Sequence, residues 1–320
     1  MHAAGPCVSV VIPCFNGERW IGEAIESVYR QTWTNVELVV VNDGSTDNSL
    51  GEITRLKSDT MTVIDQENRG QTASLNRGLS QCTGAIVQYL DADDALAPNK
   101  IMNQVIHLKD NPDYVAAAEW SVTSAAAPLD FSDPSVGAGG PATASSPVDW
   151  LVNNWGDGGG MMYPAMWLIP MEIVKRVGPW REDLTLMNDT EYFTRIVLAS
   201  RGVVHCPDAI SYYRKGHASM SSTKTARAWR SYFEATELCS NRLLAVESSD
   251  RTRRVASFLW QRLAQGCYPY ERKLGSEALR RANLLHADRL SLPGGLIYNL
   301  ISATLGWKVA RSLQVLSGRS

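Results

Sequence analysis

Three carboxylates, Asp91, Asp93 and Asp94, lie within four residues of one another, directly after the apolar segment at 85–90. Like charges this close shift the pKa values of one another's carboxyl groups, so their proximity needs a physical reason. A solvated turn is one such reason. A divalent cation is another, because Mg²⁺ and Mn²⁺ prefer oxygen ligands and a bound cation cancels the repulsion.

Two more polar segments follow apolar ones: PCFNGE at 13–18, and NDGSTD at 42–47, which contains Asp43 and Asp47. These two aspartates either cap the next helix or join a site for a cation and a diphosphate. A metal-bound diphosphate is a good leaving group, because the metal stabilises the charge that develops as its bond breaks. Arg69, in ENRGQ, would add a fork of hydrogen-bond donors to such a site.

Apolar and amphipathic segments alternate along the first 120 residues. Short β-branched and apolar runs predict buried strands at 7–13, 35–43, 61–65, 85–90 and 114–120. Segments between them predict helices at 19–32, 45–57, 72–81 and 100–110. This alternation predicts an α/β, Rossmann-like fold, in which helices flank a mainly parallel sheet. The three polar loops would then share the carboxyl edge of the sheet, where ligands bind.

The composition is that of a globular chain whose partner is not nucleic acid. Of the 320 residues, 44% are hydrophobic and 20% are charged, which is the range of folded proteins. The six cysteines form no C-x-x-C pair, which predicts reduced thiols and a cytoplasmic location. Residues 251–320 hold 12 Lys or Arg against 3 Asp or Glu, whereas residues 1–250 hold 19 against 30. The acidic majority of the chain and the pI near 6.2 argue against nucleic acid.

No dinucleotide-binding G-x-G-x-x-G follows the first strand, and neither a P-loop nor a G-x-S-x-G elbow occurs. The remaining motifs resemble a known family. Residues 8–49, 67–79 and 84–94 together resemble the donor half of glycosyltransferase family 2, the inverting nucleotide-sugar enzymes with a GT-A fold. Residues 178–196, GPWREDLTLMNDTEYFTRI, resemble the segment that carries the catalytic base of that family. The resemblance covers about residues 7–217, with four motifs in order.

The resemblance implies a role for each matching position. The residues expected to line the nucleotide pocket are Pro13, Phe15, Asn16, Glu18, Asp43, Gly44, Ser45, Arg69, Asp91 and Ala92. Within that pocket, Asp43 would accept a hydrogen bond from the base, and Asp91 would lie near the ribose. Asp93 would hold a Mn²⁺ or Mg²⁺ ion that bridges the diphosphate. His217 would either reach the metal or the diphosphate, or lie on the polar surface.

The resemblance also assigns a base. Asp189, in NDTE, would accept the proton of the acceptor hydroxyl as that hydroxyl attacks the anomeric carbon from the far face. Such a base must be ionised before the reaction, and a place near a helix N-terminus favours the charged form. The alternative is that Asp189 caps the following helix, with Glu191 in its first turn.

Two departures from the family pattern narrow the prediction. Where the family often has Ala-Arg-Asn, this chain has Ser74, Leu75 and Asn76, so that an arginine near the donor is missing or is replaced by Arg69 or Arg77. The Q-x-x-R-W signature of processive synthases is absent, and no apolar stretch reaches 18 residues. We therefore expect a transferase that adds a single sugar.

The predicted organisation is a GT-A domain over residues 1–220 and a basic helical C-terminal region over 221–320. The donor half of the domain would cover about 7–120, and the acceptor half, with the base, about 121–220. Four aromatic residues of the acceptor half either stack on acceptor sugars or anchor the core and loops: Trp150, Trp155, Tyr163 and Trp167.

The last amphipathic segment, at 296–316, has an apolar stripe at Ile297, Ile301, Leu305, Val309 and Leu313. This pattern is typical of a packed C-terminal helix. Together with the basic charge of the region, it is also compatible with a helix on an anionic lipid surface.

The predicted function is that of a metal-dependent inverting glycosyltransferase of the hexosyltransferase type. It would move a sugar from a nucleotide donor, a UDP-sugar, to a hydroxyl of a glycan or lipid-linked acceptor in surface polysaccharide assembly, peripherally on the inner face of the membrane. Two alternatives stay open. One is a non-catalytic sugar-nucleotide-binding protein. The other is a D-x-D phosphatase. It is less favoured because the motif of those enzymes normally follows the first core strand, whereas here three predicted strands come before it.

Overall fold

The structure is a computed structural model that describes residues 5–109, 111–124, 142–156, 160, 162–216, 225–268, 270–288, 300–302, 304 and 306–316. The chain divides into two compact units. Unit 1 comprises Met1–Pro147, Met162–Glu182 and Arg195–Ala218, and unit 2 comprises Val148–Met161, Asp183–Thr194 and Ser219–Ser320. The predicted domain boundary near residue 220 stays a prediction.

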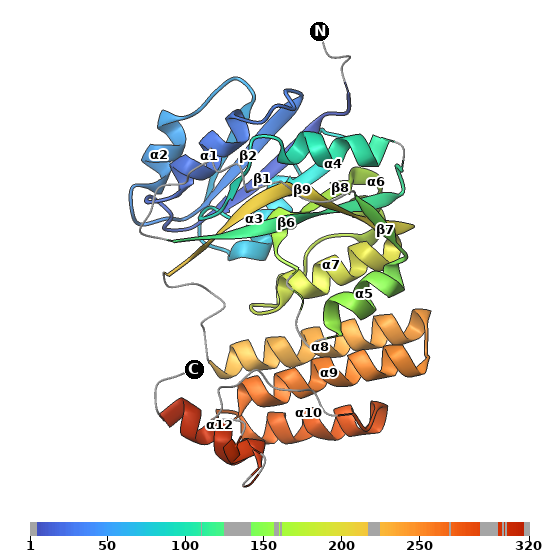
Figure 1. The fold of residues 1–320 in the computed structure, drawn as a ribbon. Coiled ribbons are helices and arrows are strands. Elements are labelled where there is room, and N and C mark those ends of the chain that lie inside the picture. Colours follow the sequence, from blue (N-terminus) through green and yellow to red (C-terminus); the bar gives the residue numbers. More distant parts are fainter. Residues whose placement is uncertain are drawn as a thin grey trace. The chain divides into compact units, whose positions relative to one another are not determined.

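Unit 1 is built on a nine-stranded sheet of order β3-β2-β1-β4-β8-β6-β9-β5, with β7 paired to β9. Figure 1 shows this sheet with helices beside it. Its strands are β1 (Val8–Cys14), β2 (Val36–Asp43), β3 (Met61–Gln66), β4 (Ile86–Tyr89), β5 (Ala95–Leu96), β6 (Tyr114–Ser124), β7 (Thr143–Ser145), β8 (Trp167–Pro170) and β9 (Gly202–Lys215).

Six of these strands run in the same direction. The pairs β1–β2, β1–β4, β2–β3 and β6–β9 are parallel. Strand β8 is antiparallel to both β4 and β6, so that β6 and β9 run parallel to β4. The carboxyl ends of β1, β2, β3, β4, β6 and β9 therefore lie along one edge of the sheet, and the mainly parallel sheet predicted from the sequence is confirmed.

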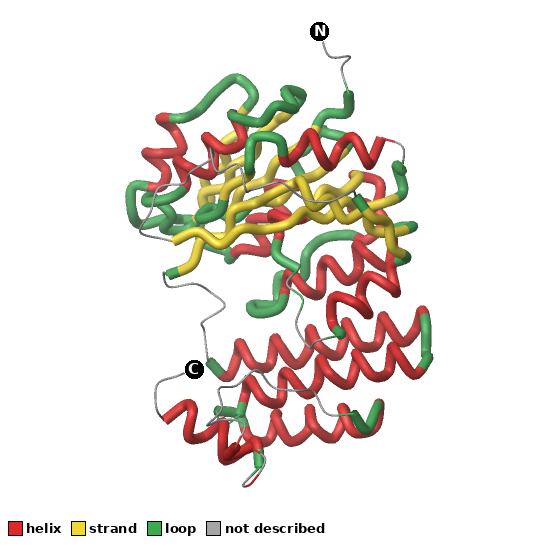
Figure 2. The backbone as a smooth tube through the Cα atoms, viewed as in Figure 1, coloured by secondary structure: helices red, strands yellow, loops and turns green. Residues whose placement is uncertain are grey.

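Helices cover the sheet and also build unit 2. They are α1 (Ile21–Tyr29), α2 (Ser49–Arg55), α3 (Gln71–Leu79), α4 (Lys100–Lys109), α5 (Pro147–Trp155), α6 (Met171–Val177), α7 (Asn188–Ala199), α8 (Ala226–Val246), α9 (Asp250–Cys267), α10 (Arg272–Leu285) and α12 (Trp307–Leu316), with a short 3₁₀ turn, η1 (Pro164–Met166). Figure 2 separates these helices from the strands by colour. In unit 1, α3 packs on β1 and β2, while α4 packs on β6, β8 and β9.

The core of unit 1 follows the predicted apolar patterns. All seven residues of β1 are buried, as expected of a strand that is covered on both faces. Helix α1 buries Ile21, Ala24, Ile25 and Val28, the spacing of a single helical face. Gly78 lets α3 approach the sheet, because a Cβ there would lie 2.5 Å from Cγ1 of a β1 valine.

Unit 2 contains α8, α9 and α10, three helices that lie in the first part of the predicted helical C-terminal region. A capping box of Ser249 and Thr252 begins α9, and this signal separates it from α8. The buried cluster between these helices consists of Trp229, Trp260, Leu263, Ala264, Cys267, Ala278 and Ala282.

The end of the chain is described in part. Ile297 and Leu305 of the predicted apolar stripe lie outside the described residues, whereas Val309 and Leu313 belong to α12 and are exposed. No helix in the described part of the chain is both long enough and apolar enough to cross a bilayer.

Candidate active site

Four loops leave the carboxyl edge of the sheet in unit 1, and they contain most of the predicted site residues. They follow β1 (residues 15–20), β2 (44–48), β3 (67–70) and β4 (90–94). Pro13 is in β1 itself and is buried, and Asp43 is the last residue of β2. The predicted convergence of these loops follows from the strand directions.

Hydrogen bonds join the loops after β1 and β2. Asn16, whose φ of 51° lies in the left-handed region, accepts a bond at Oδ1 from the Thr46 amide at 2.8 Å. Its own amide donates to Ser45 Oγ at 3.0 Å. The Gly17 amide donates to Ser49 Oγ at 2.8 Å. The two loops therefore form one rigid ledge beside the ends of β1 and β2.

Glu18 and Asp47 complete the ledge by holding the start of α2. Glu18 Oε2 accepts from the Asn48 amide at 2.8 Å, and Asp47 accepts from the amides of Glu18 (3.1 Å) and Ser49 (3.0 Å). Burial acts to raise the pKa of Asp47, but these hydrogen bonds and that of the Ser49 hydroxyl bring it below its usual range. Asp47 thus has the helix-capping role that the sequence left open for it.

Asp43 is buried and organises the loop after β3. Its Oδ1 accepts from Gln66 Nε2 (2.8 Å) and from the Arg69 amide (2.9 Å), and its Oδ2 accepts from the Gly70 amide (2.8 Å). A carboxylate has about four acceptor positions, so these three bonds leave one for a ligand. Gly44 follows with a φ of +69°, and a Cβ there would lie 2.6 Å from the Asn68 nitrogen, so this turn requires glycine.

Two side chains of these loops are open to a ligand. Phe15 is 52% exposed, unusual for a large apolar residue beside a buried strand, and it offers a ring face for stacking. The Arg69 side chain is exposed next to the Asp43 hydrogen bonds.

The acidic loop after β4 is a tight turn in which the Asp94 amide donates to the Asp91 carbonyl at 3.1 Å. Gln71 Nε2, at the start of α3, donates to Asp91 Oδ1 at 2.9 Å. Asp94 is only 3% exposed. Its Oδ1 accepts from the Arg214 amide at 2.9 Å, and its Oδ2 meets no hydrogen-bond partner among the described residues. Burial, with the charges of Asp91 and Asp93, raises the pKa of Asp94 well above its usual range.

Arg214, at the end of β9, fixes this loop. Its side chain is 2% exposed; Nε donates to the Asp93 carbonyl at 2.9 Å, and Nη2 pairs with Glu23 of α1 at 2.5 Å. Arg214 was not predicted as a site residue, because nothing in the sequence around it shows that it contacts a loop more than 100 residues earlier. Successive side chains of a strand point to opposite faces of the sheet. This alternation is the signal that would have shown Arg214 pointing away from the face of its two neighbours in β9.

The carboxylates of the acidic turn suit a hard cation, Mg²⁺ or Mn²⁺, that binds together with a phosphate group. No group of three His, Cys, Asp or Glu that would hold a metal by itself occurs within the described residues. Mg²⁺ and Mn²⁺ are commonly held by one or two carboxylates, with phosphate oxygens and water completing the shell. Asp93 and Asp91, with Ala92 between them on a turn that is pinned on both sides, can supply those carboxylates. His217, the second predicted metal ligand, lies outside the described residues.

Asp189 is near the start of α7, in unit 2. Its Oδ1 accepts a hydrogen bond from the Thr190 amide at 2.6 Å. Burial raises the pKa of its carboxyl, and the bonds from Thr190 only oppose that effect. The pKa of Asp189 is thus raised overall, whereas a helix N-terminus alone would lower it. Glu191, next but one, is fully buried and pairs with Arg242 of α8 at 3.3 Å, so it anchors this helix.

Three of the four aromatic residues named for the acceptor half have the core role that the sequence left open beside sugar stacking. Trp155, Tyr163 and Trp167 are buried, and sugar stacking on them is excluded because their rings are covered by protein. Trp150 is half-buried.

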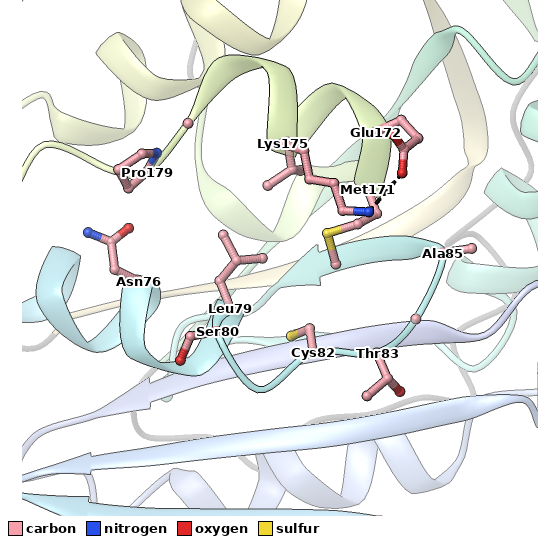
Figure 3. Close-up of a pocket in the computed structure, with 13 residues that line it drawn as sticks. Asn76, Leu79, Ser80, Cys82, Thr83, Ala85, Met171, Glu172, Lys175 and Pro179 are labelled. Atoms are coloured by element: carbon pink, nitrogen blue, oxygen red, sulfur yellow. Dashed lines mark hydrogen bonds and ion pairs between the residues drawn. The ribbon is translucent and has the colours of Figure 1, made fainter.

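A cavity of about 540 Å³ also opens in unit 1, but at the amino-terminal edge of the sheet, between α3 and α6 (Figure 3). Its polar side chains already have partners: Asn76 donates to the Trp180 carbonyl at 2.9 Å, and Lys175 pairs with Glu172 at 2.8 Å. Leu79 and Met171 contribute apolar lining. Without free polar groups that converge on a ligand, this cavity lacks the features of a reaction site.

Comparison with known proteins agrees with the geometry of the carboxyl edge. The family model described as Glycosyl transferase family 2 matches residues 9–134. An uncharacterized glycosyltransferase of Rickettsia felis is 26% identical over 301 residues, which are 90% of this chain and 47% of that protein. One of Nostoc sp. is 43% identical over 101 residues, 31% of each chain. This chain thus spans less than half the length of these relatives.

Solved structures match over nearly the whole chain. S. aureus TarS 1–349, in complex with UDP-GlcNAc, has a TM-score of 0.71 at 17% identity, covering 98% of this chain and 92% of that one. The mannosyltransferase PcManGT from Pyrobaculum calidifontis, in complex with GDP-Man and Mn²⁺, has a TM-score of 0.56 at 17% identity, covering 99% and 89%. At this identity the likeness establishes the fold alone, and the predicted GT-A fold with a helical C-terminal region is confirmed.

Proposed function

We propose that this protein is an inverting, metal-dependent glycosyltransferase of family 2, whose family model matches residues 9–134. It moves one sugar at a time from a nucleotide donor to a hydroxyl of a glycan or lipid-linked acceptor, in surface polysaccharide assembly. The observation that carries this proposal is the acidic turn at Asp91–Asp94, pinned at the carboxyl edge of the sheet beside Asp43.

The proposed donor is a UDP-sugar. The exposed ring of Phe15 stacks on the base, the remaining acceptor position of Asp43 takes its N–H, and Arg69 pairs with the diphosphate. Asn16, Glu18, Gly44 and Ser45 hold the ledge on which the nucleotide lies. UDP is favoured because TarS, the solved protein with the higher TM-score of the two described above, contains UDP-GlcNAc.

Asp93 holds the cation, and Asp91 lies near the ribose with Ala92 between them. When bound, a Mn²⁺ or Mg²⁺ ion would neutralise the charge that develops on the diphosphate as it leaves. Arg214 and Asp94 keep the turn in place, so that Asp93 is positioned before the ligand arrives. A place for His217 beside the metal remains part of the proposal.

Asp189 is the proposed base, which accepts the proton of the acceptor hydroxyl. A single displacement from the far side of the anomeric carbon inverts its configuration. Since burial raises the pKa of Asp189, the carboxyl keeps its proton to a higher pH than an ordinary aspartate, whose pKa is about 4. The base is therefore available above its raised pKa, and the rate falls as the pH falls through that value.

The test is a thermal-shift panel of UDP, GDP, dTDP and CDP, each with Mn²⁺ and with EDTA. A ligand that binds only the folded state raises the apparent melting temperature. We expect a shift with UDP that needs Mn²⁺ and is lost in Asp93→Ala. Asp59→Ala, at an exposed loop position, is the matched control and should keep it. A metal-independent shift, or a shift that survives in Asp93→Ala, contradicts the proposal.

A non-catalytic sugar-nucleotide-binding protein is the second candidate, because the hydrogen bonds that hold Asp43 and the acidic turn lie within unit 1 and do not involve Asp189. Incubation with UDP-sugar, Mn²⁺ and no acceptor separates the two, because transferases slowly transfer the sugar to water. Release of free sugar that is lost in Asp189→Asn supports the enzyme. Binding without any release supports the second candidate.

We also propose that unit 2 makes peripheral contact with anionic lipid. Tyr268 and Trp307 form an edge-to-face pair at 5.6 Å, and Arg272 and Lys308 lie 5.8 and 6.0 Å from the Tyr268 ring. Aromatic rings with cations around them are typical of membrane interfaces. Sedimentation with phosphatidylglycerol vesicles but not phosphatidylcholine vesicles is expected. Loss in the double variant Arg272→Gln, Lys308→Gln supports the contact, and unchanged sedimentation refutes it.

A further inference from the structure

A cluster of three aromatic rings and one lysine lies at the ends of β6 and β9 in unit 1. Trp120 meets Tyr213 edge to face at 6.2 Å and Tyr163 at 6.4 Å, and Tyr163 meets Tyr213 at 5.8 Å. Lys215 Nζ lies 5.4 Å from the centroid of the Trp120 ring and 5.8 Å from that of Tyr213. These four residues are called the aromatic–lysine cluster below.

The strand register places the cluster on one face of the β6–β9 pair. Val122 of β6 is paired with Tyr213 of β9, and Lys215 is paired with the residue two positions after Val122. Alternate residues of a strand point to opposite faces, so Trp120, Val122, Tyr213 and Lys215 share a face. Arg214 lies between the last two and points the other way, where its Nε reaches the Asp93 carbonyl.

The cluster lies at the edge of the sheet that holds the acidic turn. Strands β6 and β9 run parallel to β4, so their last residues reach the same edge as the residues after β4. In the strand order β4-β8-β6, two spacings separate β4 from β6, which is about 10 Å. The nucleotide ledge belongs to β1 and β2, on the other side of β4. A group on the cluster would therefore lie at the same edge of the sheet as the acidic turn, on the side of β4 opposite the nucleotide ledge.

The cluster has a fixed base and an open top. Tyr163 is buried, and its hydroxyl shares a 2.5 Å hydrogen bond with Ser211 Oγ. Trp120 is 38% exposed and Val122 51% exposed, and the Lys215 side chain is exposed. Glu119, the nearest acid along β6, pairs with His205 at 2.7 Å on the other face of the strand. The open side of the cluster therefore presents apolar ring surface and one positive charge.

From this geometry we infer that the aromatic–lysine cluster is an acceptor subsite for an anionic glycan, one that carries phosphate or carboxylate groups. The inference rests on the proposed function. The apolar C–H face of a sugar ring packs on Trp120 and Val122, as apolar groups do on aromatic rings. The ammonium of Lys215, which here lies over two rings, pairs with the anionic group. A neutral glycan uses only the first of these contacts.

The test uses the full chain with UDP and Mn²⁺ on an array of neutral oligosaccharides and their phosphorylated and uronic-acid counterparts. We expect the unmodified protein to bind anionic glycans about tenfold more tightly than neutral ones. Lys215→Met should remove this preference and leave the weak neutral binding. Trp120→Ala should weaken both kinds of binding about tenfold, and Trp120→Phe should restore most of it. Phosphate and carboxylate arms of the array show which anion is preferred.

Matched controls come from α4 of the same unit. Lys109→Met removes an exposed lysine and Ile106→Ala an exposed apolar side chain, and both should bind as the unmodified protein does. The Mn²⁺-dependent UDP shift of every variant reports that the protein is folded and that the donor site is intact. Absence of that shift in the unmodified protein refutes the proposed function, whatever the array shows.

With the UDP shift intact, three results overturn the subsite. They are binding that is unchanged in Trp120→Ala, an anionic preference that survives in Lys215→Met, and no binding of any anionic glycan by the unmodified protein. When an acceptor substrate is in hand, the same variants should raise its KM and leave the KM of the UDP-sugar unchanged. A purely structural role of Trp120 would alter both values together.

Discussion

Two carboxylates at opposite edges of the sheet in unit 1, Glu37 and Asp94, differ in their hydrogen bonds and in the direction of their pKa shifts. At the amino-terminal edge, Glu37 accepts hydrogen bonds from the Ser9 hydroxyl (2.5 Å), the Thr83 amide and hydroxyl (2.5 and 2.7 Å) and the Gly84 amide (2.9 Å). Partial burial acts to raise its pKa, but these bonds together hold the pKa below its usual range. At the carboxyl edge, Asp94 has one oxygen with a hydrogen-bond partner and one without a partner in the described part of the chain, beside two further acids, and its pKa is raised.

This difference separates structure from function. A carboxylate whose oxygens are all bonded to nearby amides and hydroxyls stabilises the fold, and nothing further is required of it. An acidic turn with an unpartnered buried oxygen lowers stability, and proteins keep such groups where a ligand compensates for them. The same contrast explains why the cavity at the amino-terminal edge, whose polar groups are paired, is not the candidate site.

The largest expected effect adds a third carboxylate, Asp189, to the comparison. Asp189→Asn should reduce transfer from UDP-sugar by about 10²- to 10⁴-fold, the usual contribution of a general base, and keep the Mn²⁺-dependent UDP shift. Initial rates measured across the acid range should show the rate of the unmodified protein falling at a pH above about 4, because the pKa of Asp189 is raised. Asp183→Asn, in the preceding loop, is the control. Full activity in Asp189→Asn would refute the base.

The next effect tests whether the acidic turn depends on its clamp. Arg214→Met removes the bonds to Asp93 and Glu23, and we expect the free energy of unfolding to fall by about 2 kcal/mol. The Mn²⁺ concentration needed for half of the UDP shift should also rise. Arg30→Met is the matched control, because it breaks an exposed ion pair of α1 that contributes little. An unchanged Mn²⁺ requirement would show that the turn is rigid without Arg214.

Glu37→Gln should have a smaller effect, confined to stability. The NH2 group of glutamine would face the N–H and O–H groups that donate to Glu37. Because this side chain is half-buried, we expect the free energy of unfolding, measured in urea at pH 7, to fall by about 1 kcal/mol. The folded pKa of Glu37 is lowered, so its contribution is fully present above the unfolded value of about 4.3 and is lost as the pH falls through the folded value.

The difference between Glu37→Gln and the unmodified protein should therefore shrink in acid. Glu172→Gln, which removes an exposed pair at the same edge, should show neither the loss nor the pH dependence. A change in UDP binding on replacing Glu37 would remove the distinction between the two edges.

Asp94→Asn should have the smallest effect on stability, about 0.5 kcal/mol or less in either direction. The asparagine oxygen can still accept from the Arg214 amide, and loss of the charge relieves repulsion from Asp91 and Asp93. Urea unfolding of Asp94→Asn beside the exposed-site control Asp113→Asn measures this. A loss of several kcal/mol would mean that Asp94 is as structural as Glu37.

The sequence predicted the part of the fold that local pattern specifies. The first four strands and their helices appear within a few residues of their predicted bounds, because each has its own apolar period and turn signals. Strand β9 was missed because Pro207 interrupts its pattern, and the β6–β9 register shifts at Ala118 and Glu119. Strand β8 has only four residues, too few for a period.

The candidate site divides in the same way. The loops with Asp43, Asp91 and Asp93 could be placed at one edge from the strand order alone. The partners of those residues could not, because Arg214 meets Asp93 across 121 positions of the chain. Whether an aromatic ring stacks on a ligand or belongs to the core stayed open in the sequence for the same reason, since Trp155 is buried and Trp120 exposed through neighbours that are distant in sequence.

The bond from Arg214 to the Asp93 carbonyl has a consequence for any attempt to excise the segment that the family model matches. A fragment that ends near residue 134, where that match ends, would contain every proposed donor residue, yet it would lack the guanidinium that immobilises the turn. Ordering that turn would then consume part of the free energy released by the incoming ligand. The position of the acidic turn thus depends on a residue of the last strand of the sheet as well as on the segment that the family model matches.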